Sequence, residues 1–311
     1  MHAQAIQLTV VPGGTAEPVA KGQAMEPTVT KITPAAEQPP RRAPLLADRV
    51  RRERVAVILK TLLLPLLTFA VVIGIWSYIH THVAPEFPAP AETWAHAQEV
   101  LADPFYDNGP NDQGIGWQLL NSLSRVAAGF GLAALVGIPL GFIMGMSRSV
   151  QMALSPLIQI LKPVSPLAWL PIGLLLFKAV DPSAIFVIFI TCIWPMIINT
   201  ATGVKAIPQD YMNVAAVLKL GKVELVRRIL FPATLPYVVT GMRLSLGIAW
   251  MVIVAAEMLT GGIGIGFWLW DEWNNLNVSS IIVAIAIIGG VGIVLDLMMG
   301  WMQTKLDYSK R

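Results

Sequence analysis

The sequence predicts an all-α integral membrane protein that crosses the bilayer about six times. Hydrophobic residues make up 55% of its 311 residues and charged residues only 13%, whereas an ordinary soluble domain carries about 25% charged residues. The apolar residues form long runs separated by charged segments, not short amphipathic stretches. Lys and Arg are absent from residues 80–118 and abundant in residues 205–236. These observations exclude a water-soluble fold.

The N-terminal 54 residues contain no periodic apolar pattern. They are rich in Pro, Ala, Thr and Gln and end in the basic cluster RVRRER at 49–54, so residues 1–54 are predicted to be a disordered cytoplasmic tail. The apolar run at 55–79 follows. It exceeds the 7–15 residues of a signal-peptide core and approaches the roughly 20 that span a bilayer, which favours a first transmembrane helix.

Five further apolar runs follow, and each is predicted to be a transmembrane helix. At 1.5 Å per residue each is long enough to cross a hydrocarbon layer of about 30 Å. The five runs are residues 119–146, 153–177, 184–204, 236–259 and 279–302.

The connecting segments predict the topology. Residues 80–118 contain six acidic residues and no Lys or Arg, while residues 205–236 contain Lys205, Lys219, Lys222, Arg227 and Arg228. By the positive-inside rule the second segment and both basic termini are cytoplasmic. Residues 80–118 then form an acidic periplasmic loop, and the Trp-rich residues 260–278 also face outward.

Several kinds of site are not expected. Cys192 is the only cysteine, so neither an internal disulfide nor a cysteine-based metal site is possible, and no metal site is predicted. No G-x-x-x-x-G-K-[ST] motif occurs, so this chain has no P-loop for ATP. The glycines at 261, 262, 264 and 266 predict a turn at the membrane surface, and the aromatic residues at 267–273 either anchor it in lipid or contact a partner protein.

Arg125, Arg243, Glu257 and Asp296 are charged residues within the apolar runs. Charges at such positions are functional hypotheses by default. Arg125 and Glu257 are expected at the outer ends of the second and fifth helices, where they form either a structural ion pair or an anion contact. Arg243 either extends to the headgroups or faces a pore.

Neutral donors on the fourth helix could also contact an anion. Asn199 and Thr200 are the main candidates, because a conducting path needs donors that bind weakly enough to release the ion. Hydrogen bonding between helices is the alternative for each. The candidate anion path therefore consists of Arg125, Asn199, Thr200, Arg243 and Glu257.

The basic segment 209–236 predicts a helical hairpin. Two short helices with one apolar face each are expected to join around Gly221 and to be closed by Pro232 and Pro236, with Glu224 and Arg228 paired at i,i+4. Such a hairpin either lies on anionic lipid or docks a partner protein.

The hairpin resembles the cytoplasmic loop of ABC-importer permeases. That pattern reads E-A-A, three residues, Gly, nine residues, then I-x-L-P. Ala215, Ile229 and Pro232 match it, while Asn213, Val214, Lys219 and Phe231 depart from it. Gly221 is expected to replace the glycine missing at 219. The resemblance implies an ATPase-coupling loop formed by Asn213, Ala215, Ala216, Gly221, Ile229 and Pro232.

A narrower resemblance extends from about residue 57 to the C-terminus. The stretches PFYDNGPNDQGIGW (104–117), PLAWLPIGL (166–174), AIFVIFITCIWPMIINTATGVKAIPQDY (184–211) and AAEMLTGGIGIGFWLWDEWN (255–274) are similar to the nitrate, bicarbonate and cyanate branch of these permeases. The resemblance makes nitrate or nitrite the expected substrate. Bicarbonate, cyanate and a sulfonate or taurine are the alternatives.

The resemblance also implies the architecture and the partners. It implies a type I ABC-importer permease with its core at 119–311, located in the bacterial inner membrane, with no catalytic activity of its own and no nucleic-acid partner. A second copy, two ATPase subunits carrying ATP-Mg and an external binding protein are its implied partners. From composition alone, an ion-coupled secondary transporter is the rival, although neither mid-membrane acid pairs nor inverted repeats are evident.

Overall fold

The protein is helical throughout the part that the structure describes. The computed structural model describes the backbone of residues 43–109 and 112–306. Five of its helices are long and apolar enough to cross a membrane, and one bent helix pair could provide a sixth crossing. Within those residues the only β-type pairing is an isolated bridge between Asp107 and Gln113. The predicted fold class is therefore confirmed.

The first helix begins earlier than the sequence suggested. Helix α1 spans Ala43–His82, and its apolar part is Leu59–His82. Residues 43–54 were expected to be disordered but are helical, because they are rich in helix-forming Arg, Leu and Ala and lack Gly and internal Pro. The remainder of the predicted tail, residues 1–42, lies outside the described residues. The chain divides by its contacts after Pro65, so α1 belongs to both resulting units.

A short helix occupies the acidic loop. Helix α2 spans Pro90–Ala102, and the connection from α1 is closed by a hydrogen bond of 2.9 Å from Trp76 Nε1 to the carbonyl of Pro88. On the far side of α2, His96 Nε2 lies 2.7 Å from Ser280 Oγ. The bond to Ser280 links this loop to the last helix of the chain.

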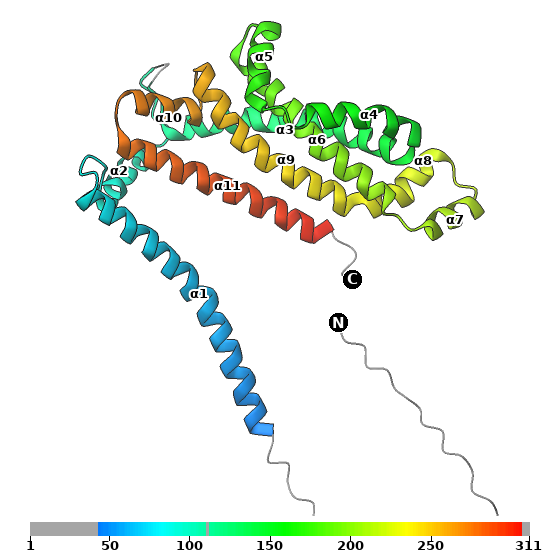
Figure 1. Ribbon diagram of the computed structural model, residues 1–311, viewed down its shortest axis with the longest axis horizontal. Coiled ribbons are helices and arrows are strands. Elements are labelled where there is room, and N and C mark those ends of the chain that lie inside the picture. The colour runs from blue at the N-terminus through cyan, green and yellow to red at the C-terminus, as the bar shows by residue number, and fades with distance from the viewer. Residues whose placement is uncertain (1–42, 110–111, 307–311) are drawn as a thin grey trace, which may run out of the picture. The chain divides into compact units, whose positions relative to one another are not determined.

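Helices α3 (Ile115–Met146), α6 (Val180–Lys205) and α9 (Phe231–Thr260) form the core of the second unit, with their axes roughly aligned (Figure 1). Small residues bring α3 and α6 together. A Cβ atom added at Gly141 would lie 2.5 Å from Thr200 Cβ, and one added at Gly145 would lie 2.6 Å from Val204 Cβ. Residues of this size at four-residue spacing are how membrane helices approach closely.

The third predicted helix is not one continuous span. Helix α4 (Arg148–Leu161) is followed by a short 3₁₀ turn η1 (Pro166–Trp169) and by α5 (Leu170–Phe177), and the two halves are bent by 97°. The prediction of a single helix at 153–177 is wrong because Pro163 and Pro166 interrupt it: proline has no N–H and clashes with the preceding turn. Figure 1 shows α5 turning across the direction of the core helices.

The hairpin continues into the fifth span. Helix α7 (Gln209–Val217) is followed by α8 (Lys222–Leu225), a π-helical turn η2 (Val226–Leu230) and α9. The segment from Val223 to Thr260 forms one apolar span of 38 residues. Pro232 and Pro236 were expected to close the hairpin, and that prediction is wrong. The π turn has already shifted the bonding pattern before Pro232, so the missing N–H is tolerated there.

Helices α10 (Ile265–Asn274) and α11 (Val278–Leu306) complete the chain. Helix α10 lies at one end of the core helices and α7 at the other (Figure 1). These are called the α10 end and the α7 end below.

Candidate functional site

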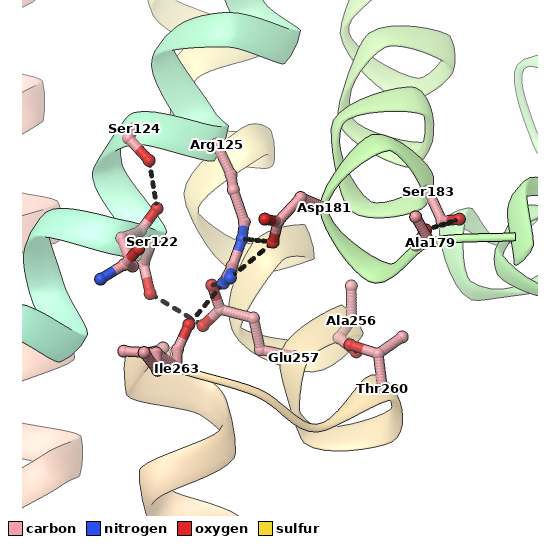
Figure 2. A network of polar contacts seen from close by, with 12 residues as sticks. Ser122, Ser124, Arg125, Ala179, Asp181, Ser183, Ala256, Glu257, Thr260 and Ile263 are labelled. Atoms are coloured by element: carbon pink, nitrogen blue, oxygen red, sulfur yellow. Dashed lines mark hydrogen bonds and ion pairs between the residues drawn. The ribbon is translucent and has the colours of Figure 1, made fainter. Parts of the chain in front are cut away.

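A network of charged side chains joins the helices at the α10 end (Figure 2). Arg125 Nη1 of α3 lies 2.6 Å from Glu257 Oε1 of α9 and donates to the carbonyl of Ile263 at 2.7 Å. Its Nε and Nη2 atoms lie 2.8 and 2.7 Å from Asp181 Oδ1, in the first turn of α6. The ion pair expected between Arg125 and Glu257 is therefore present, with Asp181 as a third member.

Glu257 also holds the turn before α10. It is fully buried, and its Oε2 atom accepts from Ser122 Oγ at 2.8 Å and from the N–H of Gly266 at 3.1 Å. Carboxylates are favourable at helix N-termini because the first N–H groups have no partner inside the helix. A Cβ atom at Gly264 would collide with the Glu257 carboxylate, so the glycine-rich sequence here permits close approach of backbone and side chain.

Two more side chains of α3 complete the cap of α10. Gln118 Oε1 accepts from the N–H of Gly264 at 2.6 Å, and Ser122 Oγ accepts from the N–H of Ile265 at 3.0 Å. Three helices thus meet in a fully bonded polar cluster. Removing one partner from such a cluster leaves another buried group unsatisfied, which is costly.

The charges in this network are matched within it. One guanidinium faces two carboxylates, so Arg125 has no uncompensated positive charge to offer an anion. The Arg125 side chain is only 8% exposed, whereas that of Asp181 is 65% exposed. A hollow of about 340 Å³ opens beside the two residues. Whether Arg125 and Glu257 line the anion path stays a prediction, but their contacts favour a structural role.

A second charge pair lies nearer the α7 end. Arg243 Nε and Nη2 on α9 bond the two carboxylate oxygens of Asp296 on α11 at 2.7 and 2.6 Å. Gln303 extends this pair: its Oε1 accepts from Arg243 Nη1 at 3.4 Å, and its Nε2 donates to Thr240 Oγ1 at 3.1 Å. Arg243 therefore pairs with a second helix. Whether it extends to the headgroups or faces the anion path stays a prediction.

The two neutral candidates on α6 have different surroundings. Asn199 Nδ2 donates to the carbonyl of Pro195 within its own helix at 2.8 Å. Thr200 is fully buried where Gly141 of α3 approaches, and its hydroxyl has no hydrogen-bond partner. Thr200 is thus packed between helices, and it faces no open path in this conformation. Its assignment to the anion path stays a prediction.

The hairpin presents apolar side chains to its surroundings. Tyr211, Val214, Val217, Leu218 and Val223 are all exposed; these five residues are called the hairpin patch. Val217 and Val223 are each 82% exposed. The ion pair expected beside the patch is present, with Arg228 Nη2 3.0 Å from Glu224 Oε1. Large apolar side chains exposed beside charged ones are typical of a protein or membrane contact.

The proposed coupling residues are divided between this surface and the interior. Asn213, Ala216, Gly221 and Pro232 are exposed and Ile229 is partly buried, but Ala215 is only 5% exposed. The small size of Ala215 is therefore needed by the packing of this chain itself. The residues of the hairpin patch, not Ala215, are available to a partner.

The glycine expected at position 219 is not replaced by Gly221. Lys219 itself adopts the left-handed conformation, with φ of 51°. The N–H of Leu220 bonds to the carbonyl of Ala215, and the N–H of Lys219 bonds to that of Ala216, both at 3.1 Å. These two bonds form a Schellman motif, in which glycine is the usual residue at the left-handed position.

Sequence reasoning missed Lys162, which lies inside the third apolar run. It is exposed, follows α4 directly, and has no Asp or Glu within ion-pair distance among the described residues. A lysine gains about 0.3–1 kcal/mol from a helix C-terminus. Placing a lysine at the bilayer centre costs about 2.5–3.5 kcal/mol or more, so the helix end does not offset exposure to lipid. The charge of Lys162 and the prolines beside it were the available signal.

The described residues contain no group of three or more His, Cys, Asp or Glu side chains that could hold a metal ion.

Comparison with known proteins identifies the family. Residues 137–308 match the family described as "Binding-protein-dependent transport system inner membrane component". The chain belongs to this family. The match includes the bent helix pair, the hairpin and α9 to α11.

Curated relatives match most of the chain. The "Nitrate import permease protein NrtB" of Synechocystis sp. is 45% identical over 77% of this chain and 87% of its own length. The "Bicarbonate transport system permease protein CmpB" of Synechococcus elongatus is also 45% identical, over 78% of this chain and 88% of its own. The "Taurine transport system permease protein TauC" of Escherichia coli is 30% identical over 77% of this chain and 86% of its own length.

Solved structures show the same fold. The MetNI methionine ABC transporter in an inward-facing conformation contains a chain that matches with a TM-score of 0.55 at 13% identity, over 62% of this chain and 95% of the other. A chain of a bacterial ABC transporter involved in alginate import matches with a TM-score of 0.53 at 13% identity, over 85% of this chain and 99% of the other. This binding-protein-dependent permease is thus a non-catalytic, multi-pass subunit of an ABC importer in the inner membrane, which implies ATPase and binding-protein partners. Family membership excludes the ion-coupled alternative.

Proposed function

We propose that this chain is the permease subunit of an ATP-driven importer of a small inorganic anion, with nitrate or nitrite as the substrate and bicarbonate as the second candidate. The observation that carries the proposal is the identity of 45–46% to permeases named for nitrate, over 77% of the chain. Permeases named for bicarbonate reach the same 45%, so bicarbonate stays in contention. The taurine permease, at 30%, is the weaker guide.

The proposed orientation places the α7 end in the cytoplasm and the α10 end outside. Its support is the charge distribution: residues 80–118 carry acidic residues only, whereas residues 205–236 are basic. The last helix ends beyond Lys305 at the α7 end, which puts the C-terminus on the cytoplasmic side. An even number of crossings then puts the N-terminus there as well.

The proposed assembly is a pair of these chains with two ATPases below and a binding protein above. The hairpin patch supports the ATPase contact, because Val217 and Val223 are apolar, highly exposed and located at the cytoplasmic end in the proposed orientation. The anion would pass between the two copies. In this assembly Arg125 and Glu257 fasten α3, α9 and α10 together, and the anion meets other residues.

Uptake by reconstituted complexes tests the function. The chain would be purified with its ATPases and binding protein and placed in proteoliposomes that contain ATP, and uptake of labelled nitrate would be followed with and without excess bicarbonate. We expect uptake that requires ATP and binding protein and that excess bicarbonate does not abolish. Bicarbonate uptake without nitrate uptake would move the assignment to the second candidate. Nitrate uptake driven by a proton gradient without ATP would refute the proposal.

A further inference from the structure

The two halves of the third span are separated by a short turn that is not helical. Residues 162–165 link α4 to η1, and the chain direction changes by 97° between the two halves. The backbone N–H groups of Lys162 and Val164 bond to the carbonyls of Ile158 and Leu161, and that of Ala168 bonds to Ser165, while Pro163 and Pro166 have no N–H. Irregular backbone inside a membrane span is tolerated only where it is buried in protein or lines a water-filled cavity.

This break lies near the middle of the bundle. Helix α4 neighbours α3 and turns back from it after the single residue Ser147 (Figure 1). At 1.5 Å per residue, its 14 residues rise about 21 Å beside an α3 that is about 48 Å long. Independently, the ring of Trp169, just beyond the break, packs 6.5 Å from that of Phe186. Phe186 lies in the second turn of α6, so the chain just after the break packs at that level of α6.

Lys162 brings an unmatched positive charge to this depth. Arg125 and Arg243 each pair with a carboxylate of another helix, whereas Lys162 has no such partner among the residues that the structure describes. Its side chain and that of Ser165 are exposed. A cation exposed at mid-membrane depth faces either water or a charged ligand, not lipid.

We propose that Lys162, with Ser165 beside it, is the anion contact at the centre of the transport path. The inference rests on the proposed function, because the ligand is the small oxyanion that the importer carries. One ammonium group and one hydroxyl attract an oxyanion without enclosing it, which suits a site that must release its ion. Both groups lie in the break and not on the face of a helix. In the break, the second copy or water can reach them.

Cysteine labelling tests whether Lys162 faces water. Lys162→Cys would be introduced into the full complex in a Cys192→Ser background, since Cys192 is buried, and treated with a charged, membrane-impermeant thiol reagent. We expect labelling that added nitrate slows at least threefold. Leu175→Cys, on the 75% exposed and apolar face of α5, is the matched control for lipid exposure and should stay unlabelled. Absence of labelling at position 162, while the wild type still imports nitrate, would overturn the inference and leave the proposed function intact.

Uptake then tests whether the charge acts on the anion. Lys162→Gln should lower nitrate uptake at least tenfold at an unchanged yield of assembled complex, and Lys162→Arg should restore at least a third of it. Lys178→Gln is the matched control, because Lys178 is also exposed and also follows a helix, but lies next to the start of α6; its uptake should stay within twofold of wild type. Equal losses in the two Gln variants, or a loss of folded complex in Lys162→Gln that Arg does not correct, would assign Lys162 a structural role and overturn the inference. Failure of the wild type to carry nitrate or bicarbonate would instead refute the proposed function.

Discussion

Glu257 is the residue on which most contacts at the α10 end converge. It is fully buried, bonds Arg125, Ser122 and the N–H of Gly266, and so ties α3, α9 and α10 together. The same arrangement makes each member dependent on the others.

Replacing one member of the Arg125–Glu257 pair should therefore destabilise the fold. Arg125→Gln leaves a buried carboxylate without its cation, which costs about 3–5 kcal/mol, so the yield of folded protein should fall. Asp181→Asn is the matched control: its side chain is 65% exposed, and exposed pairs contribute about 1 kcal/mol or less.

The double variant Arg125→Gln/Glu257→Gln should recover folded protein relative to Arg125→Gln, because no buried charge is then left alone. The yield can be followed by size-exclusion chromatography in detergent. A wild-type yield together with reduced nitrate uptake in Arg125→Gln would instead favour a direct anion contact.

Lys219 is strained where glycine would not be. Its left-handed φ of 51° costs a residue with a Cβ atom about 1–2 kcal/mol. Glycine removes this cost but loses about 0.4–1 kcal/mol of the gain, because the unfolded chain has more freedom with glycine. We expect Lys219→Gly to stabilise the protein by up to about 1 kcal/mol and to raise its thermal unfolding midpoint. Gly221→Ala is the control: Gly221 has no positive φ and open space around it, so the variant should not be destabilised. A lower midpoint in Lys219→Gly would contradict the assignment of strain.

Part of the candidate site could be predicted from sequence. The positive-inside rule placed Arg125 and Glu257 at the same membrane surface, and their pairing followed. Asp181 was missed because α6 begins at Val180, four residues before its apolar run suggested. The bonds from Gln118 and Ser122 to the turn before α10 depend on how α3 packs against that turn, which no local pattern encodes.

At the scale of elements, some hairpin residues pack inside this chain and others are exposed to a partner. Ala215 is buried in this chain, so Ala215→Glu should disturb the hairpin itself as well as any contact with an ATPase. Val217→Asp tests the contact alone, because Val217 is 82% exposed. We expect Val217→Asp to lower nitrate-dependent ATP hydrolysis at least tenfold while the permease still folds, since a buried interface does not accept an unpaired charge.

The control for the hairpin is Tyr78→Asn on α1, an exposed residue far from it in the sequence, which is 60% exposed. Its ATP hydrolysis should match that of the wild type. Full activity in Val217→Asp would show that the ATPase docks elsewhere.

The turn between α9 and α10 depends on glycines that leave no room for a side chain. A Cβ atom at Gly266 would collide with the carbonyl of Val254 and approach Glu257 Cβ to 3.0 Å. Overpacking of this kind costs about 1–3 kcal/mol, so Gly266→Ala should reduce the yield of folded protein. Gly290→Ala, where nothing lies within 4 Å, is the matched control and should leave the yield unchanged; equal yields in both variants would contradict the packing at this turn.

The elements themselves were only partly predictable. Hydropathy located five of the spans, because a helix in contact with lipid needs apolar side chains along its whole length. It could not reveal the 97° bend after α4, since the apolar run at 153–177 extends over both sides of the bend. Pro232 suggested a helix end that is absent, because the π turn of η2 compensates for the missing N–H. Pro163 marked a real interruption of the third span.

At the scale of the whole molecule, the proposed orientation can be tested by labelling intact cells. In a Cys192→Ser background, Asp107→Cys should react with an impermeant maleimide and Val223→Cys should react only after the cells are opened. Both positions are exposed on the protein, so a difference in reaction reports the side of the membrane. The reverse pattern would invert the topology.

The half-depth position of the break after α4 also divides the electrical work of import. A membrane potential of 100 mV, negative inside, opposes the entry of each monovalent anion by about 2.3 kcal/mol. An anion halfway through the hydrocarbon layer has crossed about half of the potential. The electrical work is therefore divided between the outer and the inner half of the path. At the anion site proposed beside Lys162, the 97° bend that interrupts one helix would give the anion a resting point between two smaller electrical barriers.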